Sequence, residues 1–245
     1  MRQQRRAFIA GLFACPACAA AAQAEAIHWN YEGAAKWGAL DGSYKSCSIG
    51  AEQSPIDLKG AIPASLGQVA IDWTPQAFVI VNNGHTIQAN AAPGGSLTLG
   101  SEKFDLKQFH FHTPSEHAVD GKRTAMEAHF VHAQPGGKLA VVGMLMVAGP
   151  ANAGFAEVMR TAPKGEGEAK LNQPLNPNAF LPNNRAMIRY EGSLTTPPCS
   201  ELVDWNVFVD PIAVAAADIE AFRTIFPMNA RPLQPTGRRF LLRGS

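Results

Sequence analysis

The sequence predicts a single domain that is mainly β, with a few short helices, around a large, mostly antiparallel and twisted β-sheet. Runs rich in Val, Ile, Phe and Thr recur between clusters of Gly, Pro and Asn along residues 25–245, which is typical of strands separated by turns. Helical periodicity occurs in only two segments. No internal repeat or low-complexity linker divides the chain, and its 245 residues, 46% of them hydrophobic, can fill one sizeable core.

The expected elements follow one another closely along the chain. Strands are predicted near residues 69–73, 77–82, 85–91, 96–99, 104–112, 125–133, 139–148, 187–193 and 203–209. Asn82-Asn83-Gly84 and the Gln134 to Gly137 segment are turn signals between strands. Helices are predicted at residues 153–162 and 216–226, because apolar residues recur there at helical spacing.

The first 24 residues are typical of an export signal. Three arginines within the first six residues form a positive region, residues 7–22 are short and apolar, and Ala22-Gln23-Ala24 fits a cleavage site. We therefore predict a signal peptide over 1–24, a mature domain over 25–245, and a periplasmic or secreted protein. Arg5-Arg6 followed by apolar residues favours the twin-arginine route, and a Sec signal is the alternative.

Cysteine content and charge agree with an exported protein. Cys47 and Cys199 remain in the mature chain, and an even pair in an oxidising compartment predicts a disulfide; two separate buried thiols are the alternative. The 21 basic and 20 acidic residues nearly balance, so no broad basic surface is available for nucleic acid. The apolar run near the N-terminus is short for a membrane span, and no membrane span is predicted.

Five of the seven histidines fall between positions 110 and 132, and His110 and His112 are separated by one residue. If residues 104–112 form a strand, these two side chains project from the same face, because alternate strand residues share a face. Two imidazoles placed in this way are half of a zinc site. A third would complete the three-ligand arrangement of a catalytic zinc, whose fourth position is open to water.

The predicted strand at 125–133 supplies a third candidate. Its alternation puts Glu127, His129 and Val131 on one face and His132 on the other. If this strand pairs with 104–112, His129 completes the site, and Glu127 and Gln108 can accept from the second ring nitrogens. His132 has the wrong parity for the site, so we expect it to be structural, as we do for His117.

Six motifs, in this order along nearly the whole mature chain, resemble the α-class carbonic anhydrases. They are Gln53-Ser54-Pro55-Ile56-Asp57, Asn82-Asn83-Gly84-His85, Gln108 to His112, Ser115 to Asp120, Glu127 to His132, and Ser193-Leu194-Thr195-Thr196-Pro197-Pro198. The resemblance implies reversible hydration of CO2 to bicarbonate and a proton, by attack of zinc-bound hydroxide. It also implies Zn²⁺ held by His110, His112 and His129.

The resemblance assigns further roles. Thr195 matches a threonine that accepts from the hydroxide and donates to a glutamate, which would be Glu116, and His85 matches the histidine that passes the proton to buffer. The CO2 pocket maps onto the apolar residues Val131, Val141, Leu194 and Trp205, together with Thr196 beside them. Residues that order water map onto Tyr31, Asn83 and Gln88. Cys47 and Cys199 match the half-cystines of bacterial members.

Two other functions are alternatives to CO2 hydration. A zinc hydrolase would use the same nucleophile on an activated ester, but the H-E-x-x-H motif of many zinc peptidases does not occur. A metal-free binding module is the non-enzymatic alternative, and retention of His110, His112 and His129 disfavours it. The expected partners are CO2 and bicarbonate, and the chain is expected to be a monomer or a homodimer.

Overall fold

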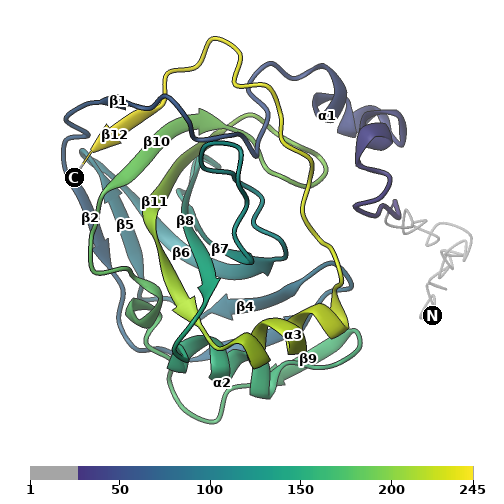
Figure 1. Ribbon diagram of the computed structural model, residues 1–245, viewed down its shortest axis with the longest axis vertical. Coiled ribbons are helices and arrows are strands. Elements are labelled where there is room, and N and C mark those ends of the chain that lie inside the picture. The colour runs from purple at the N-terminus through teal and green to yellow at the C-terminus, as the bar shows by residue number, and fades with distance from the viewer. Residues whose placement is uncertain (1–26, 245) are drawn as a thin grey trace, which may run out of the picture.

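One twisted sheet holds most of the regular structure (Figure 1) in a computed structural model that describes residues 27–244. Its strands are β1 (Ile62–Pro63), β2 (Val69–Asp72), β3 (Phe78–Asn82), β4 (Ile87–Ala91), β5 (Ser96–Leu99), β6 (Glu102–His112), β7 (Met126–Ala133), β8 (Leu139–Ala148), β9 (Gly167–Lys170), β10 (Met187–Gly192), β11 (Val203–Val214) and β12 (Leu242–Gly244). The α-helices are α1 (Ser46–Ile49), α2 (Ala153–Thr161) and α3 (Ala216–Ile225), and the 3-10 helices are η1 (Ala34–Ala39), η2 (Gly42–Tyr44) and η3 (Pro177–Phe180).

The strand order is β1-β12-β10-β11-β8-β7-β6-β4-β3-β9, and β5 joins β6 to β2 outside this path. Most neighbours are antiparallel, whereas β8 with β11 and β1 with β12 are parallel. The predicted fold class is therefore confirmed. The parallel pairs are not foreseeable from alternation within each strand, because pairing direction is decided by the connections between strands.

The differences from the sequence predictions are local. Strands β1, β9 and β12 were not predicted, because two to four residues carry too little periodicity. The strand expected from residue 85 begins at Ile87, since the side chain of Asn83 accepts from the amides of His85 and Thr86 and extends the turn. The strand expected to stop at 209 runs on past Pro211 through an irregularity in its pairing with β8, as strand prolines commonly require.

Strand alternation divides the buried residues between the two faces of the sheet. On one face, Phe109, Phe111 and Phe130 pack with Phe155 of α2 and Phe222 of α3 in the larger core, and α2 and α3 lie together against this part of the sheet (Figure 1). The opposite face holds a second cluster, formed mainly by residues of β8, β10 and β11. His110 and His112 of β6 and His129 of β7 project on this second side, away from the large core, whereas His132 of β7 faces the large core.

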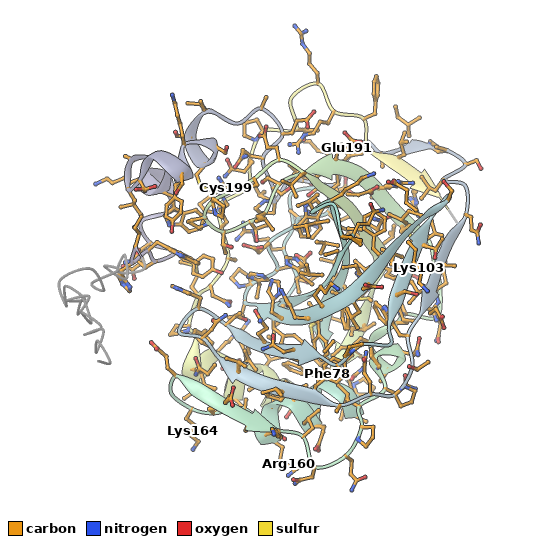
Figure 2. All side chains as sticks on the ribbon, turned by 180° about the vertical axis from the view of Figure 1, so that it is seen from behind. Phe78, Lys103, Arg160, Lys164, Glu191 and Cys199 are labelled. Carbon is orange, nitrogen blue, oxygen red and sulfur yellow. A yellow bond between two sulfur atoms is a disulfide. The ribbon has the colours of Figure 1, made fainter. Side chains whose placement is uncertain are left out.

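The N-terminal helices η1, η2 and α1 are tied to the sheet by the predicted disulfide. Cys47, in α1, is bonded to Cys199, on the loop that follows β10, and Figure 2 shows Cys199 beside these helices. The bond confirms the pairing expected from the cysteine count and fits an oxidising compartment. Among the described residues, no helix is long and apolar enough to cross a bilayer. The predicted signal over 1–24 lies outside the described residues.

Candidate metal centre

The pairing of β6 with β7 brings three histidines together. His110 is directly opposite His129, and on the same face His112 is opposite Glu127 and Gln108 is opposite Val131. The ring centroids lie 5.0 Å apart for His110 and His112, 5.3 Å for His110 and His129, and 4.6 Å for His112 and His129. One nitrogen from each ring lies within 4.8 Å of the others, so the face predicted from strand parity is the face observed.

Each ring has one nitrogen facing an acceptor. Nδ1 of His110 donates to Oε1 of Gln108 at 2.8 Å, and Nδ1 of His112 donates to the carbonyl of Asn229 at 2.7 Å. These directions follow because both partner oxygens can only accept. Nε2 of His129 lies 2.9 Å from Oε1 of Glu127, although off the best direction for a hydrogen bond. Such partners fix the tautomer and leave the other nitrogen free to bind a metal.

The electrostatics of the three rings suit a cation. Burial, reinforced by the neighbouring histidines, lowers the pKa of His110 well below its usual value, and burial also lowers the pKa of His112. Both rings are therefore neutral near pH 7, the form in which imidazole binds metals. Nε2 of His112 is buried without a hydrogen-bond partner. A buried lone pair of this kind fits a metal ligand, and the donor set of three imidazoles fits Zn²⁺.

Glu127 lies at the centre of a buried hydrogen-bonded chain. It accepts from the backbone amide of His117 at 2.8 Å and from Nδ1 of the same residue at 2.7 Å. Nε2 of His117 in turn accepts from the hydroxyl of Tyr190 at 2.6 Å. Burial alone would raise the pKa of Glu127, but His117 and His129 lower it well below its usual value. The structural role expected for His117 is thus to orient Glu127 toward the third histidine.

Glu116 and Thr195 do not form the expected hydrogen bond in the described part of the chain. Oε1 of Glu116 accepts from the backbone amide of Arg231 at 2.8 Å. Oε2 has no hydrogen-bond partner and lies 3.5 Å from Nε2 of His112 and 3.9 Å from Nδ1 of His129. This carboxylate oxygen is therefore placed next to the imidazoles and makes no hydrogen bond to Thr195.

His110, His112 and His129 line a pocket of about 170 Å³. All of the predicted pocket and water-ordering residues line it: Val131, Val141, Leu194, Thr196, Trp205, Tyr31, Asn83 and Gln88. Thr195 and His85 line it as well. Val131 and Val141 pair across β7 and β8, and Val141 and Trp205 pair across β8 and β11, so one wall is apolar and continuous with the second core cluster.

His85 lies at the polar side of the pocket and is stacked on Trp29. Their ring centroids are 3.8 Å apart and the planes differ by 6°. Burial lowers the pKa of His85, His28 lowers it further, and Glu166 opposes both. Trp29 itself was not predicted as a site residue. It lies in a loop far in sequence from His110, His112 and His129, and it has no periodic signal of its own.

Other residues of the site were also missed. Tyr190, Asn229 and Arg231 reach it from segments far along the chain, through backbone or side-chain bonds, and Thr86 lines the pocket. Arg231 is fully buried, donates to the carbonyls of Ser54 and Cys47, and lies over the ring of Trp37. A fully buried arginine needs such partners, but no local pattern in the sequence reveals them.

Comparisons with known proteins agree with this geometry. A family model described as eukaryotic-type carbonic anhydrase matches residues 32–243. A carbonic anhydrase of Nostoc is 40% identical over 231 residues, covering 90% of this chain and 88% of its own, and one of Neisseria gonorrhoeae is 38% identical, covering 94% of each. The solved α-carbonic anhydrase of Thermovibrio ammonificans is 41% identical, with a TM-score of 0.86 over 89% of this chain and 99% of its own.

Proposed function

The chain belongs to the α-class carbonic anhydrases, zinc enzymes that hydrate carbon dioxide, and we propose that His110, His112 and His129 hold its zinc. The observation that carries this assignment is the convergence of three imidazoles, each with one nitrogen facing an acceptor. When bound there, zinc lowers the pKa of a coordinated water to about 7, a value measured on carbonic anhydrase itself, and so supplies a nucleophile at neutral pH.

The apolar wall of the pocket receives the substrate in this proposal. CO2 has no net dipole and few strong hydrogen-bonding groups, so it gains from a site that excludes water. Val131, Val141, Leu194 and Trp205 supply that surface next to the three histidines, and Thr196 lies at its edge. The pocket volume suits a small substrate together with a few waters.

Thr195 and Glu116 orient the nucleophile. Oε1 of Glu116 is engaged by the amide of Arg231, which leaves Oε2 as an acceptor. An ionised carboxylate only accepts, so a hydroxyl that bonds to it must give its proton. Rotation of Glu116 toward Thr195 would therefore leave the threonine oxygen free to accept from the nucleophile and to fix the direction of its attacking lone pair.

His85 carries the released proton to buffer. Imidazole titrates near neutral pH, and this ring is half-buried at the polar side of the pocket, where Tyr31, Asn83 and Gln88 can order the connecting waters. Replacement of His85 by alanine should slow turnover in weak buffer, and added imidazole should restore it. Unchanged turnover in weak buffer would remove His85 from this role.

The ligand assignment is tested with His110→Ala, measured by zinc content and by stopped-flow CO2 hydration. We expect loss of both. His132→Gln is the matched control: His132 lies on the same strand as His129 but faces the large core, where it bonds to Trp73, so zinc and activity should be kept. Full activity in His110→Ala would contradict the assignment.

Export of the protein is the remaining part of the proposal. The disulfide between Cys47 and Cys199 supports an oxidising compartment, and the predicted signal over 1–24 supports the periplasm or the exterior. Because the twin-arginine route carries folded proteins, zinc would be bound before export. Fusing residues 1–30 to a reporter tests the export route. Export that depends only on Sec would refute the twin-arginine route and, with it, the binding of zinc before export.

A further inference from the structure

The sheet does not itself fix His85 relative to the metal-binding strand. β4 pairs with β6 only from Asn90, opposite Gln108, to Gln88, opposite His110. His85 precedes the last pair by three residues and lies in the turn before β4. Strand hydrogen bonds therefore stop short of it, and its backbone must be held by other groups.

Two asparagine side chains hold the backbone of His85. Oδ1 of Asn83 accepts from the amide of His85 at 3.0 Å, within the turn. Nδ2 of Asn229 donates to the carbonyl of His85 at 3.0 Å and also to the carbonyl of Phe111, on β6, at 2.9 Å. Asn83 thus shapes the turn. The hydroxyl of Thr86 connects the turn to Phe111 on β6, and Asn229 connects the backbone of His85 itself to the same strand.

The same residue contacts the metal centre through its main chain. The carbonyl of Asn229 accepts from Nδ1 of His112 at 2.7 Å, and its Oδ1 accepts from the amide of Thr113 at 2.7 Å. Its side chain is 1% exposed, and every one of its polar groups is used. A buried asparagine that is satisfied in this way is a rigid connector, because any movement would leave a buried polar group unpaired.

We propose that Asn229 is a positioning residue for proton transfer, holding the backbone of His85 in a fixed place relative to the zinc ligand His112. This inference rests on the proposed function and extends it. Relay of a proton through ordered water requires the acceptor at a set distance and orientation from its source. The side chain of Asn229 provides that link, while its backbone carbonyl separately orients His112.

Asn229→Ala deletes the link to His85, together with the side-chain bonds to Phe111 and Thr113, and keeps the main-chain carbonyl that faces His112. Proton release follows the hydration step, so a misplaced relay lowers kcat and leaves kcat/KM unchanged. We expect kcat in weak buffer to fall about threefold to tenfold, and added imidazole to restore it. Asn229→Ser, whose shorter side chain withdraws from the His85 carbonyl, should give the same split.

Asn178→Ala is the matched control. Nδ2 of Asn178 also donates to a distant backbone carbonyl, that of Trp73, at 2.6 Å, but neither residue lines the pocket. This variant should lose some thermal stability and keep kcat in weak buffer.

Zinc retention, measured by competition with a chelator, should be the same in Asn229→Ala as in the unaltered protein.

The double variant with His85→Ala separates the inference from the proposed function. If Asn229 acts through His85, adding Asn229→Ala to His85→Ala should lower kcat no further. A parallel fall in kcat/KM, faster zinc loss, a further fall in the double variant, or unchanged kcat in Asn229→Ala would each overturn the inference. If instead His85→Ala alone kept full kcat in weak buffer, the relay assigned to His85 would fail, and the role of Asn229 with it.

Discussion

Replacing His132 by glutamine should make the folded protein less sensitive to acid. His132 is buried, and its Nε2 accepts from Nε1 of Trp73 at 3.0 Å, so the proton of the neutral ring is on Nδ1, facing the carbonyl of Ala140. Burial lowers the pKa of His132 to about 4. A proton added to Nε2 would face the indole N–H, so two donors would be opposed.

The size of the effect follows from linkage between proton binding and folding. In the unfolded chain His132 titrates near 6.5, so the unfolded state takes up a proton that the folded state binds only near pH 4. The stabilisation is fully present above pH 6.5 and is lost as pH falls from there to about 4. At 1.36 kcal/mol per pKa unit, the loss is about 3 kcal/mol.

The assay is urea unfolding of the zinc-loaded proteins near neutral pH and near pH 4. His132→Gln should lose about 3 kcal/mol less of its unfolding free energy on acidification than the unaltered protein, because a glutamine carbonyl can still accept from Trp73 but does not titrate. Protonation of the zinc ligands is common to both proteins and cancels in the comparison. His28→Gln, at an exposed position, is the control. An equal acid loss in His132→Gln and the unaltered protein would refute the reasoning.

Three further predictions concern other contacts. Glu127→Gln should weaken zinc binding about tenfold to a hundredfold, measured by chelator competition, because Glu127 faces His129; unchanged affinity would contradict its orienting role. Replacing Cys47 and Cys199 together by serine should reduce the unfolding free energy by up to about 5 kcal/mol, since the bond spans 152 residues. As a check, this double variant should be as stable as the parent protein whose disulfide has been reduced. Phe130→Ala should lower the unfolding free energy, measured in urea, by about 3–5 kcal/mol and should retain zinc. The reason is that its ring stacks between those of Trp73 and Phe109, with centroid distances of 4.5 and 4.7 Å, on the face of the sheet away from the three histidines. A loss below 1 kcal/mol would be too small for a buried aromatic ring.

Much of the fold could be predicted because long strands carry their own signal. β6, β7 and β8 have eight to eleven residues each, enough for alternation to identify both the strand and the side chains that share a face. The short strands β1, β9 and β12 have no such signal and form only when neighbouring strands offer hydrogen bonds. The parallel pairing of β8 with β11 depends likewise on how distant segments connect.

The candidate site divides in the same way. By itself, the sequence determined that His110 and His112 share a face and that His129 and His132 do not, because the direction of a strand side chain is a local property with a period of two residues. Only the tertiary structure decided that His129 lies opposite His110, that Trp29 stacks on His85, and that Asn229 connects His85 to β6. Those contacts join segments up to 144 residues apart, and they depend on the packing of the whole sheet, which no local pattern encodes.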